Sequence, residues 1–180
     1  MVYVFLAEGF EEIEALTPVD ILRRGGVEVI TVGVTGKIVA SSHKIPVTAD
    51  ITIDDIKNYN ELEAVILPGG MPGTLNLEKN DTVINSVKHC ISNNILVGAI
   101  CAAPSILGHL GFLEGKNATA FPGFETELKG AKLDKEYVSH DGMIVTARGM
   151  GVSTEFALKL LEILRGVDVA VKIKDTIQCR

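Results

Sequence analysis

Short apolar runs rich in β-branched residues alternate along the chain with segments of helical periodicity. Continuous apolar runs of this length are typical of strands covered on both faces, as in parallel sheets. The predicted strands are 2–7, 27–34, 64–68, 95–100 and 143–147. The predicted helices are 11–26, 80–94, 103–113, 153–166 and a last segment that reaches about residue 173.

Strands that alternate with helices in this way predict a parallel sheet with helices on both faces. We therefore expect an α/β, flavodoxin-like three-layer sandwich with a mainly parallel sheet, formed by residues 1–180 as one domain. In helix 11–26 we expect four core contacts, and helix 153–166 begins with residues typical of a capping box. These expected core residues are Ile13, Leu16, Ile21 and Leu22. The irregular segment 37–49 is predicted as a short hairpin or as edge strands.

Composition and charge narrow the functional classes. The 180 residues are 47% hydrophobic and carry 17 Lys and Arg against 23 Asp and Glu, a formal net charge of -6. A duplex nucleic-acid partner is therefore not expected, because such partners need a basic surface. No apolar run is long enough to span a bilayer, and the acidic start is a poor signal peptide. Three irregularly spaced cysteines argue against a disulfide scaffold. We expect a cytoplasmic protein that does not bind membranes.

Four loops of the predicted sheet carry the candidate chemistry. They follow the first, third, fourth and fifth predicted strands and read AEGFEEIE, PGGMPG, ICAAP and RGMG. In open α/β sheets, ligands bind beyond the carboxyl ends of the strands, near the point where the strand order reverses. We therefore expect all four loops to lie at one edge of the sheet.

Cys101 stands between an apolar strand and a helix in the stretch ILVGAICAAPSIL. A cysteine here is either a small apolar filler of the core or a nucleophile, whose thiolate a helix N-terminus would favour. Its position at the predicted edge favours the nucleophile, held on a turn like the elbow of hydrolases. The N–H of Ala102 and an N–H from Gly69 or Gly70 would then form an oxyanion hole.

A carboxyl group close to this thiol would act as its proton partner. Glu14 lies beside apolar residues and has a spacing that allows it to face the sheet edge, although spacing alone favours it only modestly over Glu11. Burial would raise the pKa of such a carboxyl, so that it could donate a hydrogen bond to the thiolate. Arg148, in the last loop, would either hold an anion or form a structural ion pair. No histidine pair has the spacing of metal ligands, so no metal site is expected.

The motifs EEIEALTPVDILRRGG, VILPGG, AICAAP and TARGMG followed by EFAL, taken together, resemble the ThiJ/PfpI superfamily, and most of all its branch typified by the Parkinson-disease protein deglycase. The resemblance implies a fold like that of class I glutamine amidotransferases and a homodimer. It also implies that Cys101 is the reactive cysteine, that Glu14 rather than Glu11 is its partner, and that Gly69–Gly70 form the turn beside them.

Two positions depart from the pattern of some members of this superfamily. Phe121 precedes Pro122 where some members carry a histidine, and Ala102 follows Cys101 where the protease-like branch has one. A peptidase or a glutamine amidotransferase is therefore not expected. Phe121, Pro122 and Arg148 are instead expected to line the pocket.

The resemblance leaves two functions open at the same site. The first is a cofactor-free glyoxalase or deglycase that acts on small reactive carbonyl compounds or glycated adducts through a thiolate at Cys101 and a protonated Glu14. The second is a redox-sensing stress protein or chaperone in which the same cysteine is oxidised. A degenerate member that only binds partners is a third, less specific reading.

Overall fold

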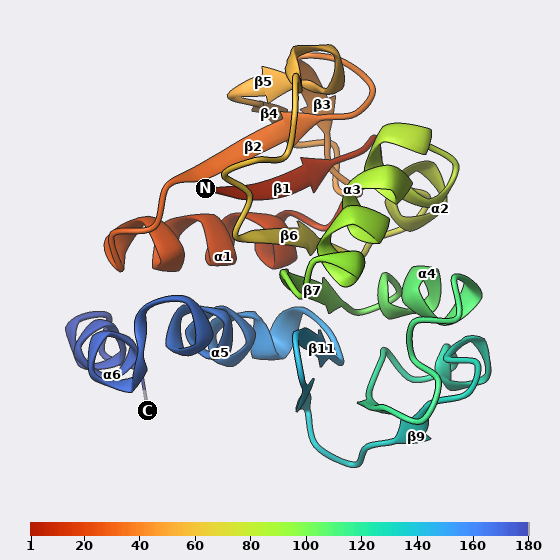
Figure 1. The fold of residues 1–180 in the computed structure, drawn as a ribbon. Helices are drawn as coiled ribbons and strands as arrows, with labels where there is room; N and C mark the ends of the chain where they lie inside the picture. The colour runs from red at the N-terminus through yellow and green to blue at the C-terminus, as the bar shows by residue number, and fades with distance from the viewer. Residues whose placement is uncertain (180) are drawn as a thin grey trace.

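The predicted alternation forms a seven-stranded central sheet in the computed structural model, which describes residues 1–179 (Figure 1). The strands lie in the order β10-β11-β7-β6-β1-β2-β5, and each neighbouring pair is parallel except β10 with β11. Their bounds are Val2–Leu6 for β1, Val29–Gly33 for β2, Ile51–Thr52 for β5, Ala64–Leu67 for β6, Leu96–Ile100 for β7, Val138–Asp141 for β10 and Ile144–Ala147 for β11. The α/β class and the mainly parallel sheet are thus confirmed.

Helices cover both faces of this sheet and give three layers (Figure 1). One face carries α1 (Glu12–Arg24), α5 (Ser153–Arg165) and α6 (Val167–Thr176). The other carries α2 (Gly73–Glu78), α3 (Asp81–Ser92) and α4 (Pro104–His109). Successive side chains of a strand point to opposite faces, so that Val4 packs in the first layer and Phe5 in the second.

Shorter elements lie in the loops that connect the main strands and helices. The expected hairpin in the irregular segment is formed by the antiparallel strands β3 (Ile38–Ala40) and β4 (Pro46–Thr48). The remaining short elements are β8 (Asn117–Ala118), β9 (Lys132–Leu133) and the 3-10 turns η1 (Ile53–Asp55), η2 (Glu125–Glu127) and η3 (Met150–Val152). None of the described helices combines the length and the apolar character that crossing a bilayer requires.

The polar start of α1 sets the position of the site. Glu11 is the N-cap of this helix, and its Oε2 accepts a hydrogen bond from the N–H of Glu14 at 2.7 Å. Such a bond satisfies one of the helix's first donors, and the negative charge complements the helix dipole. Gly25 ends the helix, as its position after the last apolar residues predicts.

Two local predictions are wrong. Ile13 and Leu16 are 45% and 38% exposed, because α1 buries the stripe of Ala15, Val19 and Leu22 instead. Ser153 does not begin a capping box, since η3 runs directly into α5 and makes Val152 the N-cap. The hydroxyl of Ser153 is buried without a hydrogen-bond partner among the described residues.

Candidate active site

The four glycine-rich or acidic loops meet at one edge of the sheet. Strands β11, β7, β6 and β1 are consecutive neighbours and run parallel, so their carboxyl ends lie side by side. β2 and then β5 lie on one side of β1, whereas the next strand of this sheet along the chain, β6, lies on the other side of β1. The strand order therefore reverses between β1 and β6, where a ligand site is expected in such sheets.

Cys101 occupies a strained turn at this edge. It follows β7 directly and has φ of +64°, the left-handed region that a residue with a side chain rarely adopts. Two hydrogen bonds fix the turn, because the N–H of Cys101 donates to the carbonyl of Ala147 at 2.8 Å and its carbonyl accepts from the N–H of Phe121 at 2.9 Å. The surroundings thus impose the strained backbone, a feature common at functional sites.

Glu14 reaches this turn from the first turn of α1. Only 1% of it is exposed, and its Oε2 accepts a hydrogen bond from the N–H of Gly69 at 2.9 Å. The N–H of Met150 also donates to its carboxyl group, and its side chain shares a hydrogen bond with Cys101. Burial, with a smaller contribution from the charge of Glu11, raises the pKa of Glu14 to about 7. A carboxylic acid with this pKa is suited to move protons at neutral pH.

The thiol of Cys101 is half-buried, and its pKa is not lowered as expected. Burial, followed by the charge and hydrogen bond of Glu14, raises the pKa of Cys101 to about 12. The helix that was expected to favour a thiolate begins only at Pro104, one turn further along the chain. The backbone N–H groups of Ala102 and Gly70 face the sulfur and lower its pKa in part.

The two ionisable groups therefore titrate together. The first proton leaves the pair near pH 7, the pKa of Glu14, and the second near the raised pKa of Cys101. Between these values the pair carries one negative charge and one proton, which the hydrogen bond allows to sit on either oxygen or sulfur. At neutral pH the remaining proton therefore lies mainly on sulfur, beside a Glu14 carboxylate that can accept it when the sulfur attacks.

The two glycines of the PGGMPG loop have different tasks. The N–H of Gly69 is bonded to Glu14, whereas the N–H of Gly70 faces the sulfur of Cys101. Of the two glycines, only Gly70 therefore directs its N–H at the sulfur, as Ala102 also does. Gly69 is instead required by close packing, because a methyl group there would lie 2.6 Å from Cβ of Cys101 and 2.7 Å from Oε2 of Glu14.

Phe121, Pro122 and Arg148 line a cleft of about 390 Å³, as predicted, whereas Cys101 and Glu14 are not among its lining residues. Met150, which also lines the cleft, connects it to the pair through its N–H bond to Glu14. The backbone of Phe121 is bonded to Cys101, and its ring stands beside Gly149, another lining residue. The cleft offers mainly apolar surface, and the aromatic side chain of Phe121 is half exposed to it. The cleft therefore presents an apolar wall next to the turn that carries Cys101.

Arg148 does not form the structural ion pair that was one of its two predicted roles. Within residues 1–179 no carboxylate lies at ion-pair distance from it. Its guanidinium lies 4.9 Å above the ring centre of Tyr137 and donates to the carbonyl of Lys135 at 3.1 Å. The arginine thus orders one wall of the cleft through a cation–π contact and a backbone bond.

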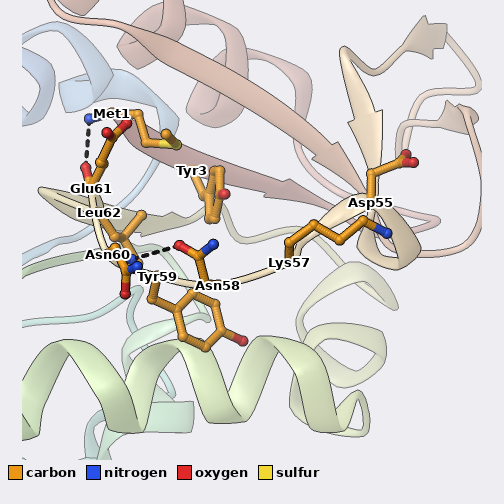
Figure 2. A pocket seen from close by; sticks show the side chains of 9 residues that line it. All are labelled: Met1, Tyr3, Asp55, Lys57, Asn58, Tyr59, Asn60, Glu61 and Leu62. Carbon is orange, nitrogen blue, oxygen red and sulfur yellow. Dashed lines mark hydrogen bonds between the residues drawn. The ribbon is translucent and has the colours of Figure 1, made fainter.

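A second hollow, of about 380 Å³, lies away from this chemistry (Figure 2). Its wall includes Met1 and Leu62, which stand just before β1 and β6 and so at the opposite ends of these strands from Cys101. Figure 2 shows Tyr3 and Tyr59 facing this hollow. None of the predicted site residues lines it.

Sequence reasoning missed two contributors to the site. The N–H of Met150 donates to Glu14, and Glu11 holds the backbone of Glu14 as the helix cap. The spacing of Glu11, three residues before Glu14 at a helix start, is typical of a cap and could have identified it. The donor of Met150 is its backbone N–H, which nearly every residue type has, so the sequence gives no indication of this contact.

The chain is thus an α/β protein with a flavodoxin-like sheet that carries a cysteine on a strained strand–helix turn beside a buried glutamate. The chain belongs to the DJ-1/PfpI family, whose model matches residues 1–163. It is 35% identical over 175 residues to the Parkinson disease protein 7 homolog of Danio rerio. The aligned region covers 95% of this chain and 93% of the Danio rerio protein.

Two further relatives bear on fold and function. The glutathione-independent glyoxalase DJR-1.2 of Caenorhabditis elegans is 31% identical over 161 residues, 88% of this chain and 85% of that protein. The structure of oxidized DJ-1 from Toxoplasma gondii superposes with a TM-score of 0.94 at 34% identity, and covers 99% of this chain and 97% of that one. The fold predicted from the sequence motifs is therefore that of the family.

Proposed function

We propose that this protein is a cofactor-free, cysteine-dependent enzyme that acts on small reactive dicarbonyls or on glycated adducts derived from them. The observation that carries the proposal is the shared hydrogen bond between Cys101 and the buried Glu14, with two backbone N–H groups facing the sulfur. The Caenorhabditis elegans relative is named a glutathione-independent glyoxalase, and this supports the same reaction class.

The first half of the reaction forms a covalent adduct. With the pair's proton on Glu14, the sulfur of Cys101 attacks the aldehyde carbon of methylglyoxal and forms a hemithioacetal. The N–H groups of Gly70 and Ala102 donate to the oxygen that becomes negative, before that oxygen takes the proton of Glu14. These groups are already fixed by the turn, so little reorganisation is needed.

The second half moves hydrogen within the adduct. Glu14, now a carboxylate, removes the proton from the former aldehyde carbon and passes it to the ketone oxygen, so that an enediol forms. Glu14 then takes the proton of the hydroxyl on the former aldehyde carbon and delivers a proton to the neighbouring carbon, which gives a lactoyl thioester. One carbon is thereby oxidised while the other is reduced. Water then hydrolyses the thioester, and lactate leaves with the thiol restored. The overall change is methylglyoxal plus water to lactate, without an external oxidant or reductant.

The direct test uses the purified chain, methylglyoxal and no added thiol. We expect lactate to appear in a stoichiometry that exceeds one molecule per chain. Absence of turnover would favour the second function, in which oxidation of Cys101 serves as a redox sensor. In that case the same two N–H groups and a protonated Glu14 would bind the oxygens of a sulfinate on Cys101. A reducing, cytoplasmic setting, which keeps the thiol available, is part of the proposal.

We also propose that the chain forms a homodimer. The side chains of Ile13 and Leu16 are 45% and 38% exposed on α1, and Met150, in the loop after β11, is 57% exposed. Apolar groups exposed in this way on a helix that is otherwise packed are typical of surfaces that a partner covers.

Replacing Leu16 by glutamate is expected to convert the dimer into a monomer, because the interface would have to bury an unpaired charge. Sedimentation analysis at micromolar concentration measures this shift. The matched control is Leu133→Glu, at a residue that is 57% exposed on the remote strand β9, and it should leave the dimer intact. A wild-type protein that sediments as a monomer would refute the proposal.

A further inference from the structure

The hollow at the other end of the sheet from Cys101 has the size of a small-molecule site. Its volume is about 380 Å³, and it lies at the amino-terminal ends of β1 and β6 (Figure 2). Ligand pockets in proteins usually have volumes of about 300–1,000 Å³. Apolar and polar groups both line this hollow, since Met1 and Leu62 share its wall with two tyrosines and two asparagines. It therefore combines the two kinds of surface that ligand pockets use.

The hydroxyl group of Tyr3 faces this hollow without a partner. Only 6% of Tyr3 is exposed, yet the residue lines the hollow, and Figure 2 shows its side chain facing it. None of residues 1–179 forms a hydrogen bond with this hydroxyl group. Burial, followed by the charges of Tyr59 and Glu28, raises the pKa of Tyr3, so the phenol stays protonated at neutral pH. Buried phenols usually have a hydrogen-bond partner, so this unpartnered donor points to a ligand in the hollow.

A second donor and a flat wall line the same hollow. Oδ1 of Asn58 accepts a hydrogen bond from the N–H of Asn60 at 3.0 Å, which leaves the amide nitrogen of Asn58 as a donor. The ring of Tyr59 is fixed from two directions. Its hydroxyl shares a hydrogen bond of 3.1 Å with Oγ of Ser86, and its centre lies 5.0 Å from that of the His89 ring. A fixed aromatic wall favours a planar ligand that packs against it.

The charged groups of the wall offset one another. Lys57 is opposed by Asp55, whose pKa it helps to lower after the hydrogen bonds of Thr52. The ammonium group of Met1 is already bound by the carboxylate of Glu63 at 3.0 Å and by the carbonyl oxygen of Glu61 at 2.9 Å. A charged ligand would lose its hydration here without a net attraction in return. The wall therefore favours an uncharged ligand.

We propose that this hollow binds a small, uncharged, planar heterocycle that presents carbonyl acceptors, as a pyrimidine base does. The hydroxyl of Tyr3 would donate to one acceptor and the amide nitrogen of Asn58 to another, while the ring packs against Tyr59. None of the residues that line the hollow takes part in the reaction proposed above, so this proposal does not depend on that function.

The test is an NMR titration with uracil of the ¹⁵N-labelled full chain, with no residues added before Met1. We expect the amide signals of residues 57–62 to shift until one uracil is bound per chain. Tyr3→Phe removes only the hydroxyl group and should weaken binding about threefold to tenfold, the effect of one lost hydrogen bond. The matched control is Tyr137→Phe, in the wall of the cleft beside the Cys101 turn, which should bind uracil as the wild type does.

Three further arms make the result decisive. Asn58→Ala should also weaken uracil binding, and Cys101→Ser should bind uracil as the wild type does. Toluene, which is planar and uncharged but has no acceptor, should not shift these signals in a saturable way at the same concentration. The NMR spectrum of each variant shows whether it is folded. Wild-type affinity in Tyr3→Phe and in Asn58→Ala, equal affinity for toluene and uracil, or unchanged signals of residues 57–62 in the wild type would overturn the proposal.

Discussion

Replacing Cys101 by serine is expected to lower the rate of methylglyoxal conversion at least about a thousandfold, the scale seen when a covalent nucleophile is removed. A serine hydroxyl is a far weaker nucleophile, and Glu14 is not basic enough to activate it. The two N–H groups of Gly70 and Ala102 remain, so binding should persist while turnover is lost. Lactate release from the purified variant measures the effect.

The matched control for this variant is Cys179→Ser. Cys179 lies next to the C-terminus and packs against the α1 and α5 layer, far in the chain from the strand-end loops. It should convert methylglyoxal at the wild-type rate. If Cys101→Ser also kept that rate, the covalent mechanism would be wrong. If the wild-type protein itself showed no turnover, the redox function would become the better explanation of the same site.

Replacing Gly69 by alanine is expected to reduce both stability and activity. The new methyl group would lie 2.9 Å from the carbonyl oxygen of Ile100 and still closer to Cys101 and Glu14. Since backbone on both sides is packed, the chain cannot relax cheaply, and overpacking of this kind costs about 1–3 kcal/mol. Any shift would separate the thiol from the carboxyl, so we expect activity to fall about a hundredfold.

Urea unfolding and lactate release measure the two effects of Gly69→Ala. Gly151→Ala is the control for stability, because Gly151 has no neighbouring atom within 4 Å of the added methyl group and its φ is compatible with a side chain. Its free energy of unfolding should stay within about 0.5 kcal/mol of the wild type. Wild-type stability and activity in Gly69→Ala would contradict the close packing described for the turn.

The sheet could be predicted from the sequence because its strands are continuous apolar runs bounded by loops. That pattern places Cys101 and the Gly69–Gly70 turn at one edge without any knowledge of side-chain contacts. The choice of Glu14 over Glu11 needed the family resemblance. Both residues lie at the start of one helix, and only the structure shows that Glu11 caps it while Glu14 is buried.

What sequence reasoning could not supply depends on the surroundings of each group. Ile13 and Leu16 fit an apolar stripe, yet α1 is rotated to bury Ala15 and Leu22. The thiol of Cys101 was expected to be acidic, but burial and Glu14 raise its pKa. His43 could not be placed at all, because the β3–β4 hairpin brings it to Glu12 from a remote part of the chain.

The central claim, that Cys101 and Glu14 share one proton, is tested most directly by the pH dependence of Cys101 alkylation by iodoacetamide, followed by peptide mass. Once the pair has lost its first proton, the fraction of its negative charge that lies on sulfur does not change with pH. The alkylation rate should therefore rise as that first proton leaves, with a midpoint near the pKa of Glu14, about 7. In Glu14→Gln only the thiol titrates, and its burial is offset in part by the N–H groups of Ala102 and Gly70. The account predicts that the midpoint of this variant rises by more than about one pH unit. The same midpoint in both proteins would contradict it.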